Sequence, residues 1–156
     1  MSILTLPRGI TGFAASESPY TPATSLRAFT TVCHTVARRL HGRVVAVTGC
    51  DSQVTPNFHV AELRLRSGVF FVLCNAYHPW LAATAKYPTW MEEPFLYSAE
   101  LCRAAESMSN FRFLQPDQLE QPLTLEALRT LSPDELSQFL YWKPERLGDV
   151  IFNFWD

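Results

Sequence analysis

The stretch His59–Ala76, HVAELRLRSGVFFVLCNA, determines the expected fold. Up to Arg66 its apolar and charged residues alternate, which is typical of a β-strand with one buried face. The apolar set is Ala61, Leu63 and Leu65, and the charged set is Glu62, Arg64 and Arg66. Ser67-Gly68 is a two-residue hairpin signal, and the run Val69–Ala76 is apolar on both faces. The stretch therefore predicts an antiparallel hairpin whose second strand is central in a sheet.

A helix and a further strand precede this hairpin. Apolar residues recur at helical spacing over residues 25–41, where Ser25 or the preceding threonine can cap the helix. His41-Gly42 should end it, with the glycine in the left-handed conformation. The β-branched run Arg43–Cys50 predicts a buried strand. Three strands after a helix indicate an antiparallel meander with the helix packed on one face.

Shorter elements are expected after the hairpin. Tyr77–Trp80 should turn the chain, and the segment Lys86–Phe95, which is broken by two prolines, should be irregular and partly exposed. A helix capped by Ser98 should extend to about residue 107, before a short strand at 111–114. Two further short helices are expected at 124–130 and 132–141, the second with a serine cap, an N1 proline and the capping-box acid Glu135.

The C-terminal stretch YWKPERLGDVIFNFWD, which begins at Tyr141, matches an amphipathic helix. Its apolar stripe at i, i+3, i+4, i+7 and i+8 consists of Leu147, Val150, Ile151, Phe154 and Trp155. Pro144 suits the first helical position, and a short strand over Val150–Phe154 is the alternative. The residues off the stripe, free for other contacts, would be Phe152, Asn153 and Asp156.

Together these elements predict an α+β fold: an antiparallel sheet of three to five strands, with a helix packed on one face and a helical C-terminal third. Because the chain has 156 residues and no low-complexity linker, residues 1–156 should form a single domain. No apolar run approaches the roughly 18 residues needed to span a bilayer. The N-terminus lacks the pattern of a signal peptide, so the cytoplasm is the expected compartment.

The charge of the chain argues against nucleic acid as a partner. The formal net charge is −2, whereas nucleic-acid binding usually shows as a basic domain or stripe. A short basic group, Arg38, Arg39, His41 and Arg43, is interpreted as cations near the negative end of a helix dipole. Phosphate binding is the alternative for this group.

Residue types used in catalysis and metal binding occur without the spacings that identify such sites. The four cysteines lie far apart and neither CxxC nor HExxH is present, so no metal ion or other cofactor is expected. A small cysteine-dependent hydrolase is the enzymatic alternative, with Cys74 as nucleophile, His78 as base and Asn75 as orienting group. However, a cysteine in an apolar strand should be an inert thiol.

The segment that begins near Tyr87 is the candidate partner-binding surface. Tyr87 and Trp90 stand beside Glu92 and Glu93 in the sequence, and aromatic anchors with charges at the rim are typical of protein interfaces. The loop acids that could extend this patch are Asp51 and Asp117. An ordinary solvated surface is the alternative interpretation of these acids.

Three short segments near the C-terminus resemble the sequence of a known family. They are Tyr141-Trp142-Lys143-Pro144, then Gly148-Asp149-Val150-Ile151-Phe152-Asn153, then Trp155-Asp156. This ending resembles that of small bacterial immunity proteins from polymorphic toxin systems, which act in competition between bacteria. A hairpin that ends in Asn75, followed by an aromatic-proline segment and helices, also fits.

The resemblance implies a cytoplasmic, non-enzymatic protein that neutralises a cognate toxin by binding its catalytic domain. If that toxin is a nuclease, acidic loops of this chain would imitate phosphate at its basic cleft. A non-catalytic regulatory subunit of another assembly is the remaining alternative.

Overall fold

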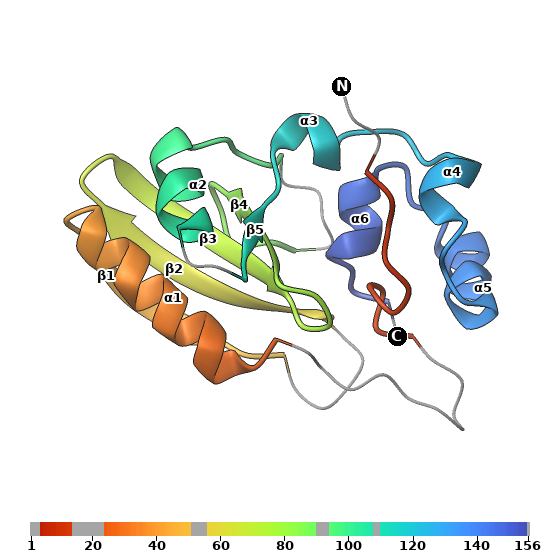
Figure 1. Ribbon diagram of the computed structural model, residues 1–156, viewed down its shortest axis with the longest axis horizontal. Helices are drawn as coiled ribbons and strands as arrows, with labels where there is room; N and C mark the ends of the chain where they lie inside the picture. The colour runs from red at the N-terminus through yellow and green to blue at the C-terminus, as the bar shows by residue number, and fades with distance from the viewer. Residues whose placement is uncertain (1–3, 14–23, 51–55, 90–93, 108–109, 156) are drawn as a thin grey trace.

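The computed structural model describes residues 4–13, 24–50, 56–89, 94–107 and 110–155 (Figure 1). Its elements are α1 (Leu26–Arg39), β1 (Arg43–Thr48), β2 (Phe58–Leu65), β3 (Gly68–Asn75), β4 (Trp80–Thr84), α2 (Ala99–Glu106), β5 (Arg112–Phe113), α3 (Pro116–Leu119), α4 (Leu125–Leu128), α5 (Pro133–Trp142) and α6 (Leu147–Ile151). The strands form one sheet in sequence order, and the α+β class is confirmed. The sheet is mixed rather than wholly antiparallel, because the crossover through α2 brings β5 back parallel to β4.

The hairpin β2–β3 lies at the centre of the sheet with the predicted alternation. Leu65 pairs with Gly68, so Arg66 and Ser67 make the turn, one residue earlier than predicted. Gly68 follows the turn with a φ of 141°, which residues with a side chain rarely adopt. This short turn fixes the register of the two longest strands.

β1 is an exposed edge strand, which contradicts the predicted buried strand. It pairs with β2 on one side, and α1 packs over one of its faces through Val44 and Val47. A bulge between Val44 and Ala46 further interrupts its pairing. The prediction was wrong because β-branched residues favour any half-buried strand and do not separate central strands from edge strands.

α1 begins as predicted and ends differently. The Ser25 side chain accepts a hydrogen bond of 3.0 Å from the N–H of Ala28. At the other end His41, rather than Gly42, has the left-handed conformation, with a φ of 56°. Gly42 is needed for space instead, since a Cβ there would overlap the carbonyl oxygen of Arg64 on β2. The glycine thus lets β1 start close against its neighbour.

Two elements, β4 and α3, were not predicted. The expected turn ends at Pro79, and the chain returns to pair with β3. Ala82 and Ala83 have weak strand propensity but are fully buried, so packing decides their conformation. The expected helices at α2, α4 and α5 are present, and the Ser132–Glu135 capping box is confirmed.

No helix among the described residues is long and apolar enough to cross a bilayer.

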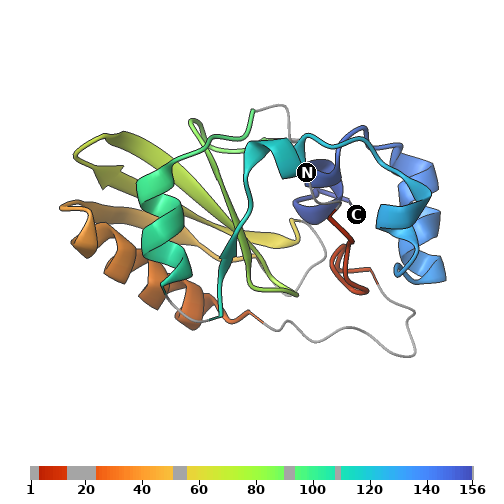
Figure 2. The ribbon, with the colours of Figure 1, turned by 45° about the horizontal axis from the view of Figure 1, so that its top comes forward.

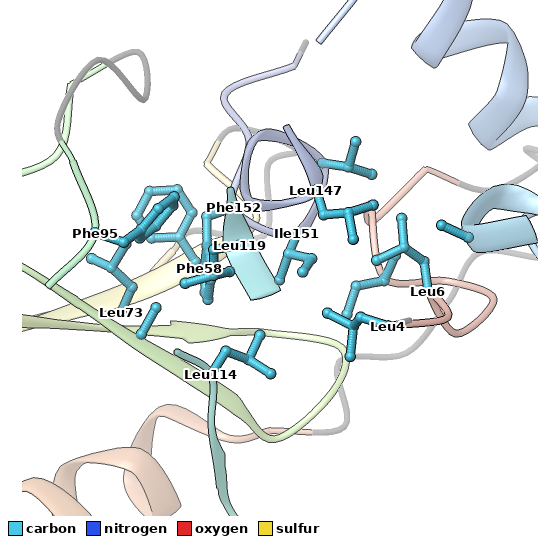
Figure 3. Packing of buried hydrophobic residues seen from close by; sticks show 14 of the residues in the cluster. Leu4, Leu6, Phe58, Leu73, Phe95, Leu114, Leu119, Leu147, Ile151 and Phe152 are labelled. Atoms are coloured by element: carbon cyan, nitrogen blue, oxygen red, sulfur yellow. The ribbon is translucent and has the colours of Figure 1, made fainter. Parts of the chain in front are cut away.

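The sheet separates two hydrophobic cores. α1 and α2 pack on one face and form the helix-face core, which contains Phe29, Leu63 and Leu101 (Figure 2). On the other face the N-terminal segment, α3 and α6 meet one end of the strands and form the C-terminal core (Figure 3). Because β-strand side chains alternate between faces, β2 contributes to both cores, with Phe58 on one side and Leu63 on the other.

The C-terminal stretch is helical only over Leu147–Ile151, whereas the sequence predicted a helix from Pro144 to beyond Phe154. Phe152 is extended, with φ −120° and ψ 93°, and both it and Asn153 are buried rather than free. The helix stops because the N–H of Asn153 donates to the Oδ1 of Asn57 at 2.8 Å and leaves the helical path. Asp156 lies outside the described residues.

Three buried asparagines join this stretch to the sheet. The Nδ2 groups of Asn57 and Asn75 both donate to the carbonyl oxygens of Ile10 and Ile151. The Nδ2 of Asn153 donates to the carbonyl oxygens of Thr11 and Val150. Buried carbonyls need such donors, because each unpaired one costs about 1–3 kcal/mol. These residues, called the asparagine network below, hold together segments that are far apart in the sequence.

The buried carboxylate of Glu135 performs a similar role for the N-terminal segment. It caps its own helix through the N–H of Ser132 and also accepts from the N–H groups of Gly9 and Thr11, at 2.9 and 3.1 Å. The hydroxyl of Thr11 donates to it at 2.6 Å. The sequence predicted only the capping-box role of Glu135, but its side chain is also fully buried because the N-terminal segment folds over it.

Replacing Glu135 with alanine should lower the free energy of unfolding by about 2–4 kcal/mol, because several buried donors would lose their acceptor. Urea unfolding followed by circular dichroism measures this change. The matched control is Asp134→Ala on the exposed side of the same helical turn, which should cost only a few tenths of a kcal/mol. Equal effects of the two substitutions would contradict a structural role for the buried carboxylate.

Candidate functional site

Among the described residues, the C-terminal core leaves uncovered the part of one sheet face that lies nearest the hairpin turn. Cross-strand pairing places Arg43, Arg64 and Val69 in one row on this face, and Ala46, Glu62 and Phe71 in the next. Paired residues share a face, which here is the one opposite the α1 side. Figures 1 and 2 show α4, α5 and α6 gathered toward the other end of the strands. These six residues, with Tyr87, are called the open sheet face.

The open sheet face has an aromatic centre. Tyr87 follows β4 and packs edge-to-face on Phe71, with ring centroids 5.8 Å apart. Tyr87 remains 49% exposed, and Val69 beside this pair is 44% exposed. Tyr87 is held in place by the ring beneath it, and a tyrosine anchored in this way is a common hot spot of protein interfaces.

Cations from two parts of the chain converge at the edge of this face. Arg43 and Arg64 are directly opposite each other in the β1–β2 register. An open groove of about 490 Å³ is lined by His41, Gly42, Arg43, Arg64, Leu65 and Arg66. Among the described residues, no acidic side chain lines this groove. It is called the cationic groove below.

The Arg43–Arg64 pairing is unfavourable for folding by itself. Like charges directly opposite in a sheet repel each other. Glu62 relieves part of this repulsion, since its carboxylate lies 3.6 Å from the Nε of Arg64, but the Arg64 side chain is still 55% exposed. An exposed ion pair of this kind contributes little. Of the three arginines that line the cationic groove, only Arg64 forms an ion pair with a described residue.

Only two of the predicted partner-binding residues can be placed. Tyr87 lies on the open sheet face, as described above. Asp117 is exposed in the first turn of α3, where its carboxylate accepts from the N–H of Gln118, and no contact between Asp117 and Tyr87 is described. The other four, Asp51, Trp90, Glu92 and Glu93, lie outside the described residues.

The side chains considered for cysteine chemistry are each engaged with the backbone. The Cys74 thiol donates to the carbonyl oxygen of Asn75 at 3.5 Å, and Asn75 belongs to the asparagine network. The Nε2 of His78 lies 3.2 Å from the carbonyl oxygen of Arg8. Burial raises the pKa of the Cys74 thiol well above its usual value, and it raises the pKa of Cys33 to about 12. Both thiols are therefore protonated at neutral pH.

The cross-strand partner of Cys74 is the buried imidazole of His59. Its Nδ1 accepts a hydrogen bond of 3.1 Å from the N–H of Cys50, and its Nε2 lies 3.1 Å from the carbonyl oxygen of Thr24. These partners assign the single proton to Nε2. The ring also stacks on Phe29 of α1. His59 thus ties the start of α1 to β2, and burial lowers its pKa below 6.5.

The sequence offered no signal for the cationic groove. Alternation correctly placed Glu62 and Arg64 on the same side of β2, but the position of Arg64 opposite Arg43 requires the register of β1, which a bulge shifts. The basic group at the end of α1 was interpreted through the helix dipole alone, and Arg38 and Arg39 do lie in its last turn.

No group of three metal-binding side chains occurs among the residues with a described structure.

Replacing Arg43 with glutamate should stabilise the protein by about 0.2–1 kcal/mol, because an opposite-charge pair with Arg64 replaces a like-charge pair. Thermal unfolding at low salt measures this gain, and high salt should reduce it. The control is the same substitution in an Arg64→Gln background, where no cation lies opposite and the gain should disappear. An equal change in stability in both backgrounds would contradict the proposed repulsion.

The stability of the protein should fall as the pH drops below 6.5. Above this value His59 is neutral in both states; below it the unfolded state takes up a proton that the folded state resists, which favours unfolding. Urea unfolding across this range measures the slope. His59→Gln should flatten it, while His34→Gln, at an exposed position of α1, should leave it unchanged.

Comparison of the chain with protein-family models, curated proteins and solved structures finds no match.

Proposed function

We propose that this protein is an immunity-type inhibitor that neutralises a bacterial toxin by binding its catalytic domain. The observation that carries the proposal is the open sheet face, where an exposed tyrosine on an aromatic support lies beside the opposed arginines Arg43 and Arg64. Tyrosine and arginine are the residues most often found as anchors of protein interfaces. A surface of this composition suits a protein partner.

The C-terminal resemblance supports the same proposal through the scaffold. A Cβ at Gly148 would overlap the ring of Phe95, so the glycine is needed for packing. Asp149 accepts from Arg146 at 2.8 Å and caps α6, and Asn153 belongs to the asparagine network. Residues with such roles specify a fold. These roles support the ending as part of the scaffold, and we propose the open sheet face as the binding surface.

The reaction of the toxin is a separate question. Trp90, Glu92 and Glu93 follow Tyr87 within a few residues of the sequence, and in a nuclease-binding protein these acids would face a basic cleft. The cations of the open sheet face would then contact the surface around that cleft. A binding surface that carries both negative and positive side chains favours one orientation of the partner and disfavours others.

The proposal predicts that a toxin domain is encoded directly upstream of this gene, and the test is co-expression of the chain with that domain. The wild-type chain should restore growth and co-purify with the toxin domain. Tyr87→Ala should weaken binding by at least about tenfold, as expected for a hot-spot residue. Binding is measured by isothermal titration calorimetry with separately purified proteins.

The matched control is Tyr141→Ala. Tyr141 is also an exposed tyrosine that packs edge-to-face on an aromatic neighbour, Trp142, but it lies on α5. This variant should bind as the wild type does. A loss confined to Tyr141→Ala would move the interface to α5. Normal growth inhibition and no complex with the wild-type chain would reject the immunity function.

A further inference from the structure

We infer that the cationic groove receives carboxylate side chains from the surface of the partner protein. This inference rests on the proposed function and specifies the chemistry of the partner at one end of the open sheet face. It differs from the expectation drawn from the sequence, in which acidic residues of this chain make the charged contacts.

The arginines of the groove come from two places in the chain. Arg43 is the first residue of β1, whereas Arg64 and Arg66 lie at the end of β2 and in the hairpin turn. Arg38 and Arg39, in the last turn of α1, do not line the groove, and the Arg39 guanidinium donates to the hydroxyl of Ser107. Such convergence raises the local potential in spite of a net charge of −2.

The backbone under the groove is rigid. Arg43 and Arg64 are fixed opposite each other by the β1–β2 pairing, and Gly42 lies so close to the Arg64 carbonyl that no side chain could fit. The left-handed conformation of His41 completes this tight junction. The backbone pairing therefore holds the Cα atoms of the two arginines at a fixed spacing, which favours a partner whose carboxylates match that spacing.

The surroundings of the groove favour an acidic protein over nucleic acid or a free anion. Val69 pairs with Arg64 on the next strand, and the Phe71–Tyr87 pair follows beside it. This apolar row continues from the cations across the open sheet face. A free anion would not use it, and a nucleic-acid-binding domain would be basic overall. A protein surface that presents carboxylates next to apolar side chains would match both parts.

The first experiment uses a hexaglutamate peptide as the acidic probe and needs no toxin. In ¹H–¹⁵N spectra of the full chain, the peptide should shift the amide signals of residues 41–43 and 64–66. The shifts should disappear in about 1 M sodium chloride, where the Debye length is about 3 Å. Arg43→Glu should weaken binding about fivefold or more, because an attraction becomes a repulsion. Arg27→Glu, which makes the same charge change on α1, should keep the wild-type affinity within about twofold.

Three outcomes would overturn the inference. The first is the absence of peptide-induced shifts at these residues. The second is equal loss of affinity in the Arg43 and Arg27 variants, which would indicate a response to net charge alone. The third is tighter binding of inorganic phosphate or of a short DNA duplex at the same residues, which would assign the groove to a free anion or to nucleic acid. The thermal unfolding of each variant is measured alongside, so that a loss of binding is distinguished from a loss of folded protein.

The second experiment repeats the calorimetry with the upstream-encoded toxin domain and the same two variants. Weaker binding of Arg43→Glu alone supports the groove as the acidic contact. Full affinity in both variants, with Tyr87→Ala still defective, rejects the groove while leaving the immunity function intact. If the wild-type chain binds no toxin, the proposed function fails, and the hexaglutamate result then reports only the intrinsic preference of the groove.

Discussion

The amides of Asn57, Asn75 and Asn153 join the end of the central hairpin to the N-terminal segment and to the C-terminal stretch. Each amide satisfies main-chain carbonyls that the core would otherwise bury without a donor. Because a buried unpaired polar group is costly, the chain can bring these segments together in only a few ways. The short length of α6 and the burial of Phe152 both follow from this join.

The same join explains why the described part of the chain leaves the open sheet face uncovered. It draws the N-terminal segment, α3 and α6 to the strand ends that carry Asn57 and Asn75 (Figure 3). The strand ends near the hairpin turn extend beyond this cover, and there the side chains become polar or half-exposed. Arginines that repel each other can persist at that end because the asparagine network and the two cores supply the stability.

Local signals in the sequence predicted local structure well. The alternation in β2, the Ser25 cap and the Ser132–Glu135 capping box each depend on neighbours within a few residues, and each is present. The features that the sequence failed to predict depend on residues that are distant in the sequence. The exposure of β1 follows from its edge position, and Glu135 is buried because a loop more than a hundred residues away folds over it. Propensity and periodicity carry no information about such contacts.

The sequence by itself determined the α+β class, the central hairpin and the aromatic residue Tyr87 as a candidate contact, because period, turn chemistry and composition are local properties. Only the tertiary structure decided which face stays open and which charges meet on it. Arg43 and Arg64 are far apart in the sequence, and a bulge and a tight glycine junction set the register that makes them neighbours. Since register is a property of two strands together, the cationic groove is visible only in the folded protein.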